Sequence, residues 1–163
     1  SDIAFGNSVF VMVGYTNGVG SIVTSPSTTT WTLRPISPPP GGPLASVAYG
    51  AGKFVAVGNN DELEYTSTTG TGTWTRSSIP GGNQISFGNG LFIVPLTSNS
   101  NLLSTDGINW NMQNTGLTNK LGKVIYANGL FMAHAGSFLV TSSDGTNWFQ
   151  YPRPLPTSSY MLQ

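Results

Sequence analysis

The sequence predicts an all-β protein made of four similar antiparallel sheets, each with four short strands. The first observation is a repeat, because segments of the form IAFGNSVFVMVG recur four times along the 163 residues. The second is that each of the four tryptophans follows such a segment, 17 to 21 residues after a shared phenylalanine. The third is that no segment has a helical period, whereas short apolar runs bounded by Gly, Pro and Asn are typical of strands.

The repeated segments align on one phenylalanine and one tryptophan each. The shared residues are Phe10, Phe54, Phe92 and Phe131, followed by Trp31, Trp74, Trp110 and Trp148. Successive phenylalanines lie 44, 38 and 39 residues apart. Four-stranded units of about 40 residues are typical of β-propeller blades. We expect the phenylalanines to be buried between blades and the tryptophans to be buried at their hairpins.

Each unit reads as four strands, which set the expected limits of the blades. Asn89-Gly90 and Asn128-Gly129 are hairpin turns after the first strand, because both positions tolerate positive φ. A single domain of residues 1–163 is expected, with blades at 1–37, 44–80, 83–116 and 122–154, and a closing strand or tail at 155–163. We expect the ring to close within one chain. The alternatives are a piece of a larger ring and an oligomer whose chains share a ring.

Composition excludes several classes of function. Charged residues make up 7% of the chain, against about 25% in a typical protein, and the net charge is zero. Nucleic-acid binding is not expected, because there is no basic surface to neutralise phosphates. No apolar run reaches the ~20 residues that a membrane-spanning helix needs, and there is no cysteine. The neutral, hydroxyl-rich surface favours an extracellular or virion-surface location.

Two nearly identical turns carry the clearest motif, STDGINW at 104–110 and SSDGTNW at 142–148. The pattern S-x-D-G-x-x-W resembles a shortened Asp-box, the repeated hairpin of sialidase-like β-propellers. Its residues here are Ser104, Asp106, Gly107 and Trp110, and again Ser142, Asp144, Gly145 and Trp148. The corresponding segments SPSTTTW at 25–31 and STTGTGTW at 67–74 lack the aspartate.

The role expected of Asp106 and Asp144 is structural. A turn aspartate accepts hydrogen bonds from backbone N–H groups one or two residues on, and the following glycine takes the positive-φ position. The indole then covers the base of the turn. In the family that these motifs resemble, this hairpin joins the two outer strands of a blade, away from the axis where ligands bind.

The same resemblance makes a sialidase-like glycoside hydrolase the alternative function. Such enzymes resemble one another in an arginine triad, whereas Arg34, Arg76 and Arg153 all follow tryptophans on or beyond the outermost strands. Glycoside hydrolysis also needs two carboxyl groups facing each other across about 5–10 Å. Outside the Asp-boxes, the carboxylates are Asp2 and those of NNDELE at 59–64, which reads as a solvated acidic loop or, as the alternative, a weak calcium site.

His134 is the only histidine, and no second metal ligand or nucleophile accompanies it. It is interpreted as a packed or channel-lining residue. The sequence therefore predicts no catalytic residue, no metal site and no cofactor.

Recognition or scaffolding is then the expected function. One hypothesis is a module that binds glycan through aromatic and amide side chains on loops over a rigid scaffold. The candidate ligand-binding residues are Tyr15, Asn17, Asn59, Asn60, Asn99 and Tyr151. The other hypothesis is a structural domain of a phage tail, fibre or decoration protein, or of a bacterial surface protein. The expected partner is a glycan or another virion or surface protein.

Overall fold

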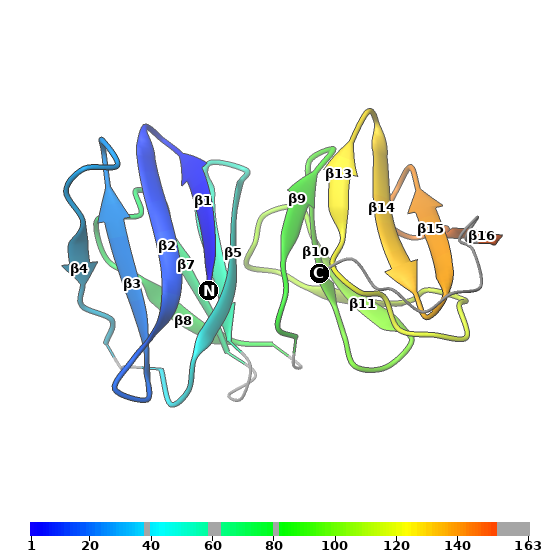
Figure 1. Cartoon of the computed structure of the whole chain (residues 1–163), viewed down its shortest axis with the longest axis horizontal. Helices are drawn as coiled ribbons and strands as arrows, with labels where there is room; N and C mark the ends of the chain where they lie inside the picture. The colour runs from blue at the N-terminus through cyan, green and yellow to red at the C-terminus, as the bar shows by residue number, and fades with distance from the viewer. Residues whose placement is uncertain (38–39, 59–62, 80–81, 153–163) are drawn as a thin grey trace, which may run out of the picture.

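The computed structural model describes residues 1–37, 40–58, 63–79 and 82–152. These residues form sixteen strands in four four-stranded antiparallel sheets, as the sequence predicted (Figure 1). Among them there is no helix long and apolar enough to span a membrane.

Each sheet consists of four strands that follow one another in the chain, and we refer to it as a blade. Blade 1 contains β1 (Asp2–Gly6), β2 (Val9–Thr16), β3 (Val19–Ser25) and β4 (Thr32–Arg34). Blade 2 contains β5 (Leu44–Gly50), β6 (Lys53–Gly58), β7 (Leu63–Ser67) and β8 (Thr75–Ser78). Blade 3 contains β9 (Ser86–Gly88), β10 (Leu91–Pro95), β11 (Ser100–Ser104) and β12 (Asn111–Asn114). Blade 4 contains β13 (Ile125–Ala127), β14 (Leu130–Ala135), β15 (Phe138–Ser142) and β16 (Phe149–Pro152).

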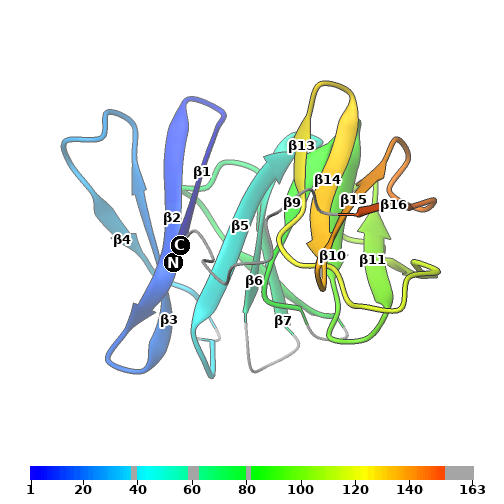
Figure 2. The same cartoon turned by 45° about the vertical axis from the view of Figure 1, so that its right-hand side comes forward.

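The blades pack face to face in chain order. Their first strands, β1, β5, β9 and β13, lie side by side, and the later strands of each blade extend outward (Figures 1 and 2). Three apolar clusters fill the three junctions between neighbouring blades. The core is therefore divided among the junctions.

Each junction contains the same close contact between an aromatic ring and a glycine of the preceding blade. The ring of Tyr49 lies against Gly6 so closely that a methyl group on this glycine would overlap it. The same holds for Phe87 against Gly50 and for Tyr126 against Gly88. Only glycine permits this approach, so the aromatic–glycine pair in the repeat sets how closely the blades stack.

The shared phenylalanines of blades 2, 3 and 4 complete these contacts. The rings of Phe54, Phe92 and Phe131 lie 4.7, 4.6 and 4.8 Å from the aromatic rings of the first strands, measured between centroids. All three side chains are fully buried, which confirms the expectation for these blades.

Blade 1 departs from that expectation. Phe10 is only partly buried, and Trp31 is 36% exposed, whereas Trp74 of blade 2 is 2% exposed. Both residues belong to the face that, in the other blades, packs on the preceding blade, and no described blade covers this face of blade 1. The prediction that all four phenylalanines and all four tryptophans are buried is therefore wrong for blade 1, and Trp110 and Trp148 are half-buried.

The described blades form an open arc. Blades 1 and 4 lie at its opposite ends in both views (Figures 1 and 2). Their outer faces expose large apolar side chains, among them Phe5 on blade 1 and Phe149 on blade 4. The expected closure within one chain is therefore not seen among the described residues. The segment 155–163, expected to be a closing strand or tail, lies outside them.

We expect Phe92→Ala to reduce the free energy of unfolding by about 3–5 kcal/mol, because it removes a fully buried ring and leaves a cavity. Phe10→Ala is the matched control, since it makes the same change at the same repeat position on an uncovered face. Its loss of unfolding free energy in chemical denaturation, measured at a concentration where the protein is monomeric, should be clearly smaller. Equal losses would contradict the assignment of blade 1 to the end of the arc.

Candidate functional site

The two Asp-box turns have the same hydrogen-bond geometry. Asp106 Oδ1 accepts the backbone N–H groups of Ile108 (2.9 Å) and Asn109 (2.8 Å), and Oδ2 accepts Asn109 Nδ2 (2.7 Å). Ser104 Oγ donates to the same carboxylate at 3.0 Å. The turn around Asp144 repeats these contacts. They are the backbone hydrogen bonds expected of a structural turn aspartate.

These hydrogen bonds favour the charged form of both carboxylates. The backbone N–H groups of Asn109 and Ile108 hold the pKa of Asp106 far below its usual value. The backbone N–H and the side-chain amide of Asn147 likewise depress the pKa of Asp144. Such groups are poor general acids, because they remain ionised at neutral pH.

A buried serine is common to the corresponding turns of all four blades. Its Oγ accepts the backbone N–H three residues on, at 2.9, 3.1, 2.8 and 2.8 Å in chain order. These serines are Ser25, Ser67, Ser104 and Ser142. The serine therefore closes the turn in every blade, and the aspartate reinforces it only in blades 3 and 4.

The turns of blades 2, 3 and 4 also pack against the preceding blade. At each of their positive-φ glycines, an added methyl group would overlap a side chain of the second strand of that blade. The contacts are Gly70 with Val11, Gly107 with Val55, and Gly145 with Ile93. The Asp-box turns, which join the two outer strands of a blade, therefore support the blade junctions.

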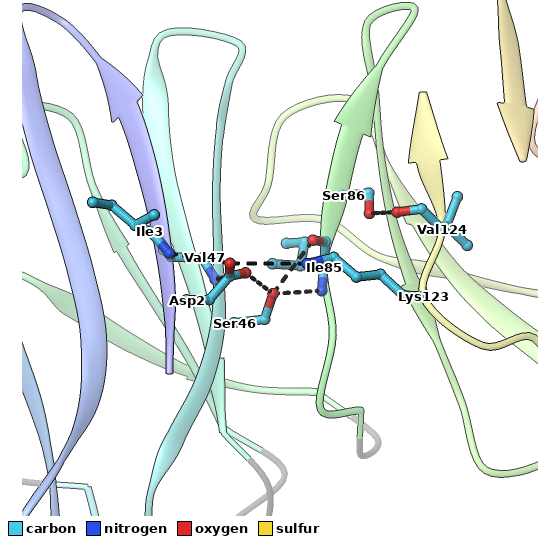
Figure 3. A network of polar contacts seen from close by, with 8 residues as sticks. All are labelled: Asp2, Ile3, Ser46, Val47, Ile85, Ser86, Lys123 and Val124. Atoms are coloured by element: carbon cyan, nitrogen blue, oxygen red, sulfur yellow. Dashed lines mark hydrogen bonds and ion pairs between the residues drawn. The ribbon is translucent and has the colours of Figure 1, made fainter. Parts of the chain in front are cut away.

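At the centre of the arc, polar contacts link the first strands of the blades (Figure 3). Asp2 Oδ2 accepts Ser46 Oγ at 2.6 Å and the backbone N–H of Val47 at 3.3 Å. Ser46 Oγ accepts the backbone N–H of Ile85 at 3.3 Å. Asp2 therefore joins blade 1 to blade 2 and, through Ser46, to blade 3.

The same network extends to blade 4. Ser86 Oγ donates to the main-chain carbonyl of Val124, and Lys123 Nζ lies 4.0 Å from Asp2 Oδ1 (Figure 3). The side chain of Lys123 is 58% exposed, so this long ion pair contributes little stability. Its positive charge therefore remains available to a ligand.

A cleft of about 600 Å³ opens between blades 3 and 4. Two of the three lysines of the chain, Lys120 and Lys123, line it together with the only histidine, His134. The amide side chains of Asn83 and Gln84 line it as well. No carboxylate is among its described lining residues, so the cleft presents positive charge and amide groups that suit a carboxylate or a phosphate.

Two polar side chains of the cleft, those of His134 and Gln84, differ in how they are held. The imidazole of His134 packs on Gly122 so closely that a methyl group there would overlap it, and the Gly122 N–H donates to the His134 carbonyl at 2.8 Å. Gln84 Oε1 is buried and has no hydrogen-bond partner among the described residues. A buried amide without a partner is costly, so a ligand that bonds to it gains affinity.

Among the residues that the sequence analysis selected for ligand binding, the described ones do not line this cleft. Tyr15 and Tyr151 are exposed on blades 1 and 4, Asn17 lies in the turn between β2 and β3, and Asn99 Nδ2 donates to the Thr118 carbonyl at 3.2 Å. Asn59 and Asn60 lie outside the described residues. The structure does not gather the described ones, and their role stays a prediction.

The sequence analysis did not select Lys120, Lys123 or Gln84. One signal could have indicated the lysines, since LTNKLGK holds two of the chain's three lysines within four residues. Gln84 directly precedes the repeated segment that begins at Ile85, and nothing in the sequence marks it as a ligand-binding residue. His134 was interpreted as a packed or channel-lining residue, and it lies exposed at the cleft.

The residues considered for catalysis are not assembled in the described structure. Arg34 Nε donates to Thr24 Oγ1 at 2.7 Å, and Arg76 lies on the outermost strand of blade 2. Residues 59–62 of the acidic loop and Arg153 lie outside the described residues. No group of three or more His, Asp or Glu side chains within the described ranges could hold a metal ion.

No protein-family profile and no curated protein matches the sequence. Several solved structures match the fold. YCF48 bound to D1 peptide matches with a TM-score of 0.67 and 13% identity, over 91% of this chain and 51% of that one. The GH74 enzyme of Niastella koreensis matches with a TM-score of 0.67 and 20% identity, over 94% of this chain and 24% of the enzyme chain. The WD40 β-propeller domain of Doa1 matches with a TM-score of 0.60 and 12% identity, over 89% of this chain and 51% of the Doa1 chain.

The fold is that of a β-propeller. Identities this low show the fold alone, because one fold hosts many functions. The chain spans about half the length of the YCF48 and Doa1 chains and about a quarter of the GH74 chain.

Replacing both turn aspartates, Asp106→Asn with Asp144→Asn, should flatten the acid dependence of stability. The pKa of each aspartate is lower in the folded state than in the unfolded state. Each carboxylate therefore stabilises the fold at pH values above its unfolded pKa of about 4, and this stabilisation is lost as the pH falls further. Thermal melts followed by circular dichroism should show a wild-type midpoint that falls between about pH 5 and pH 2. The double variant should have a lower thermal midpoint at neutral pH, and its midpoint should fall less than that of the wild type between about pH 5 and pH 2. An unchanged acid slope would contradict the structural role.

Proposed function

We propose that the protein is a non-catalytic recognition module built from Asp-box-type β-propeller blades. Its ligand is an acidic segment of a partner protein, bound in the cleft between blades 3 and 4. The observation that carries this proposal is the position of Lys120, Lys123 and His134 at one cleft, in a chain where only 7% of residues are charged.

The form of the cleft supports a peptide ligand. The two ammonium groups can pair with carboxylates, and the amides of Asn83 and Gln84 can bond to peptide groups. No Phe, Tyr or Trp is among its described lining residues, so it lacks the large stacking surface that commonly accompanies sugar binding. A protein with the same fold, YCF48, has been solved bound to a peptide.

The use of the carboxylates supports a non-catalytic role. Asp106 and Asp144 accept hydrogen bonds within their own turns, and Asp2 bonds to Ser46 and Val47. Glycoside hydrolysis, the alternative function, needs two carboxyl groups facing one substrate. The GH74 enzyme shares the fold at 20% identity, which does not carry its activity to this chain.

A glycan is the second candidate ligand, and a different observation favours it. Tyr15 and Tyr151 are exposed aromatic residues outside the three junctions within the arc, and sugars stack on such rings. We retain with it the extracellular or virion-surface setting, which is supported by the low charge and the hydroxyl-rich composition.

Binding of a fluorescein-labelled hexaglutamate peptide, measured by fluorescence anisotropy, tests the proposed cleft. The double substitution Lys120→Gln with Lys123→Gln should weaken binding about five- to tenfold, because two exposed cationic partners are removed. Lys53→Gln is the control, since it removes the third lysine, which does not line the cleft. Equal affinity of the wild type and the double variant would exclude the cleft as an acidic-peptide site.

A glycan array probed with the same proteins separates the two ligands. If sugar is the ligand, Tyr15→Ala or Tyr151→Ala should abolish signals that the lysine variants retain. Hydrolysis of a fluorogenic sialoside by the wild type would contradict the non-catalytic proposal, and we expect none.

A further inference from the structure

Blade 1 carries an uncovered apolar face. Directly paired residues form a row across its four strands, and directly opposite residues share one face of a sheet. The row consists of Ile3, Met12, Val23 and Leu33. Phe5 lies beside it, two residues from Ile3 on the same face, with its ring 4.5 Å from that of Phe10. Ile3, Phe5, Met12 and Leu33 are all exposed.

Blade 4 carries a second uncovered apolar face, at the other end of the arc (Figure 2). A row of paired residues crosses its strands and contains Ile125, Met132, Thr141 and Phe149. A neighbouring pair, Leu139 and Tyr151, adds to this face. Ile125, Leu139, Phe149 and Tyr151 are exposed. Contiguous apolar surface of this kind indicates an interaction site.

The two faces are the two halves of one blade junction. Ile3 occupies the repeat position of Val47, Ile85 and Val124, which are all buried against the preceding blade. Ile125 occupies the position of Ser86, on the face of blade 3 that packs on blade 4. Among the described residues, no blade packs on this face of blade 1, and none packs on this face of blade 4.

The share of two neighbours that this chain covers bears on what packs on the two faces. The chain covers 51% of the YCF48 chain and 51% of the Doa1 chain, so two such arcs match the length of one of these chains. We propose that a second copy of this chain closes the ring. Blade 4 of each copy packs on blade 1 of the other, which gives a two-fold symmetric dimer with two equal junctions.

The internal junction between blades 3 and 4 shows which residues meet. Ser86 of blade 3 bonds to the main chain of Val124 in blade 4. The equivalent of Ser86 in blade 4 is Ile125, and the equivalent of Val124 in blade 1 is Ile3. Ile125 of one copy therefore lies next to Ile3 of the other.

Two side chains make this junction less close than the internal ones. Ala127 stands where the first three blades have a glycine, so its methyl group meets Phe5 of the second copy. Thr28, at φ 67, stands where the later blades have the turn glycine that packs on the preceding blade. The junction between two copies is therefore weaker than the junctions within one chain, and dimer formation depends on protein concentration.

Sedimentation equilibrium of the 163-residue chain tests this assembly. The expected mass rises with concentration from 17.1 kDa to twice that value, 2 × 17.1 = 34.2 kDa. Ile3→Lys or Ile125→Lys should hold the protein at the mass of one chain. Ile108→Lys is the matched control, because Ile108 is 54% exposed, against 52% for Ile3 and 51% for Ile125, but lies in an Asp-box turn off both faces. This variant should dimerise like the wild type.

Two further variants separate assembly from folding. Ala127→Gly should lower the dimer dissociation constant about fivefold or more, because it removes an overpacked methyl group. Ile3→Lys combined with Ile125→Glu in one chain should restore the dimer, since each junction then pairs opposite charges. Circular dichroism checks that every variant is folded. A wild type that stays monomeric, a continuous series of higher masses, or an equal effect of Ile108→Lys would overturn the proposal and assign the two faces to another partner.

Discussion

The approach of an aromatic ring to a bare glycine backbone is the constraint on which the rest of this structure depends. Tyr49 on Gly6 fixes the distance and the register between the first strands of blades 1 and 2, and Phe87 on Gly50 does so for the next pair. With that spacing, the shared phenylalanines fill the junctions, and the first strands come within hydrogen-bond distance at the centre. The cleft between blades 3 and 4 is a consequence of the same stacking, since its two walls belong to different blades.

The blades were predictable from the sequence because their signals are local and repeated. The Asn-Gly turns, the shared phenylalanines and the S-x-D-G-x-x-W motif each act within one hairpin or one sheet, and the period makes chance agreement improbable. Burial of Phe10 and Trp31 was not predictable in the same way, because it depends on a neighbouring blade and not on the repeat itself. The cleft was missed because Gln84 and Lys120 are 36 residues apart in segments without a motif, and only the packing of two blades brings them together.

Charge is scarce in this chain, and the contacts of several charged residues show what those residues do. Asp106 and Asp144 hold turns, Asp2 joins blades at the centre, and the hydrogen bonds elsewhere come mostly from hydroxyl, amide and backbone groups. Lys120 and Lys123 are different, because neither stabilises a turn or a junction to a comparable degree. Exposed cations that contribute little to folding are free to contribute to binding, which is the physical basis for assigning recognition to this cleft.

Closure of the ring and binding in the cleft are separable, because the cleft is formed by blades 3 and 4 of a single arc. In the proposed dimer, however, the two-fold axis places a second, identical cleft in the same ring. Two sites at a fixed separation bind a partner with two acidic segments more tightly than either site alone, provided that its linker spans the distance. Ligand binding at the charged clefts is then coupled to dimerisation through the apolar faces. A ligand that occupies both copies at once shifts the equilibrium towards the dimer.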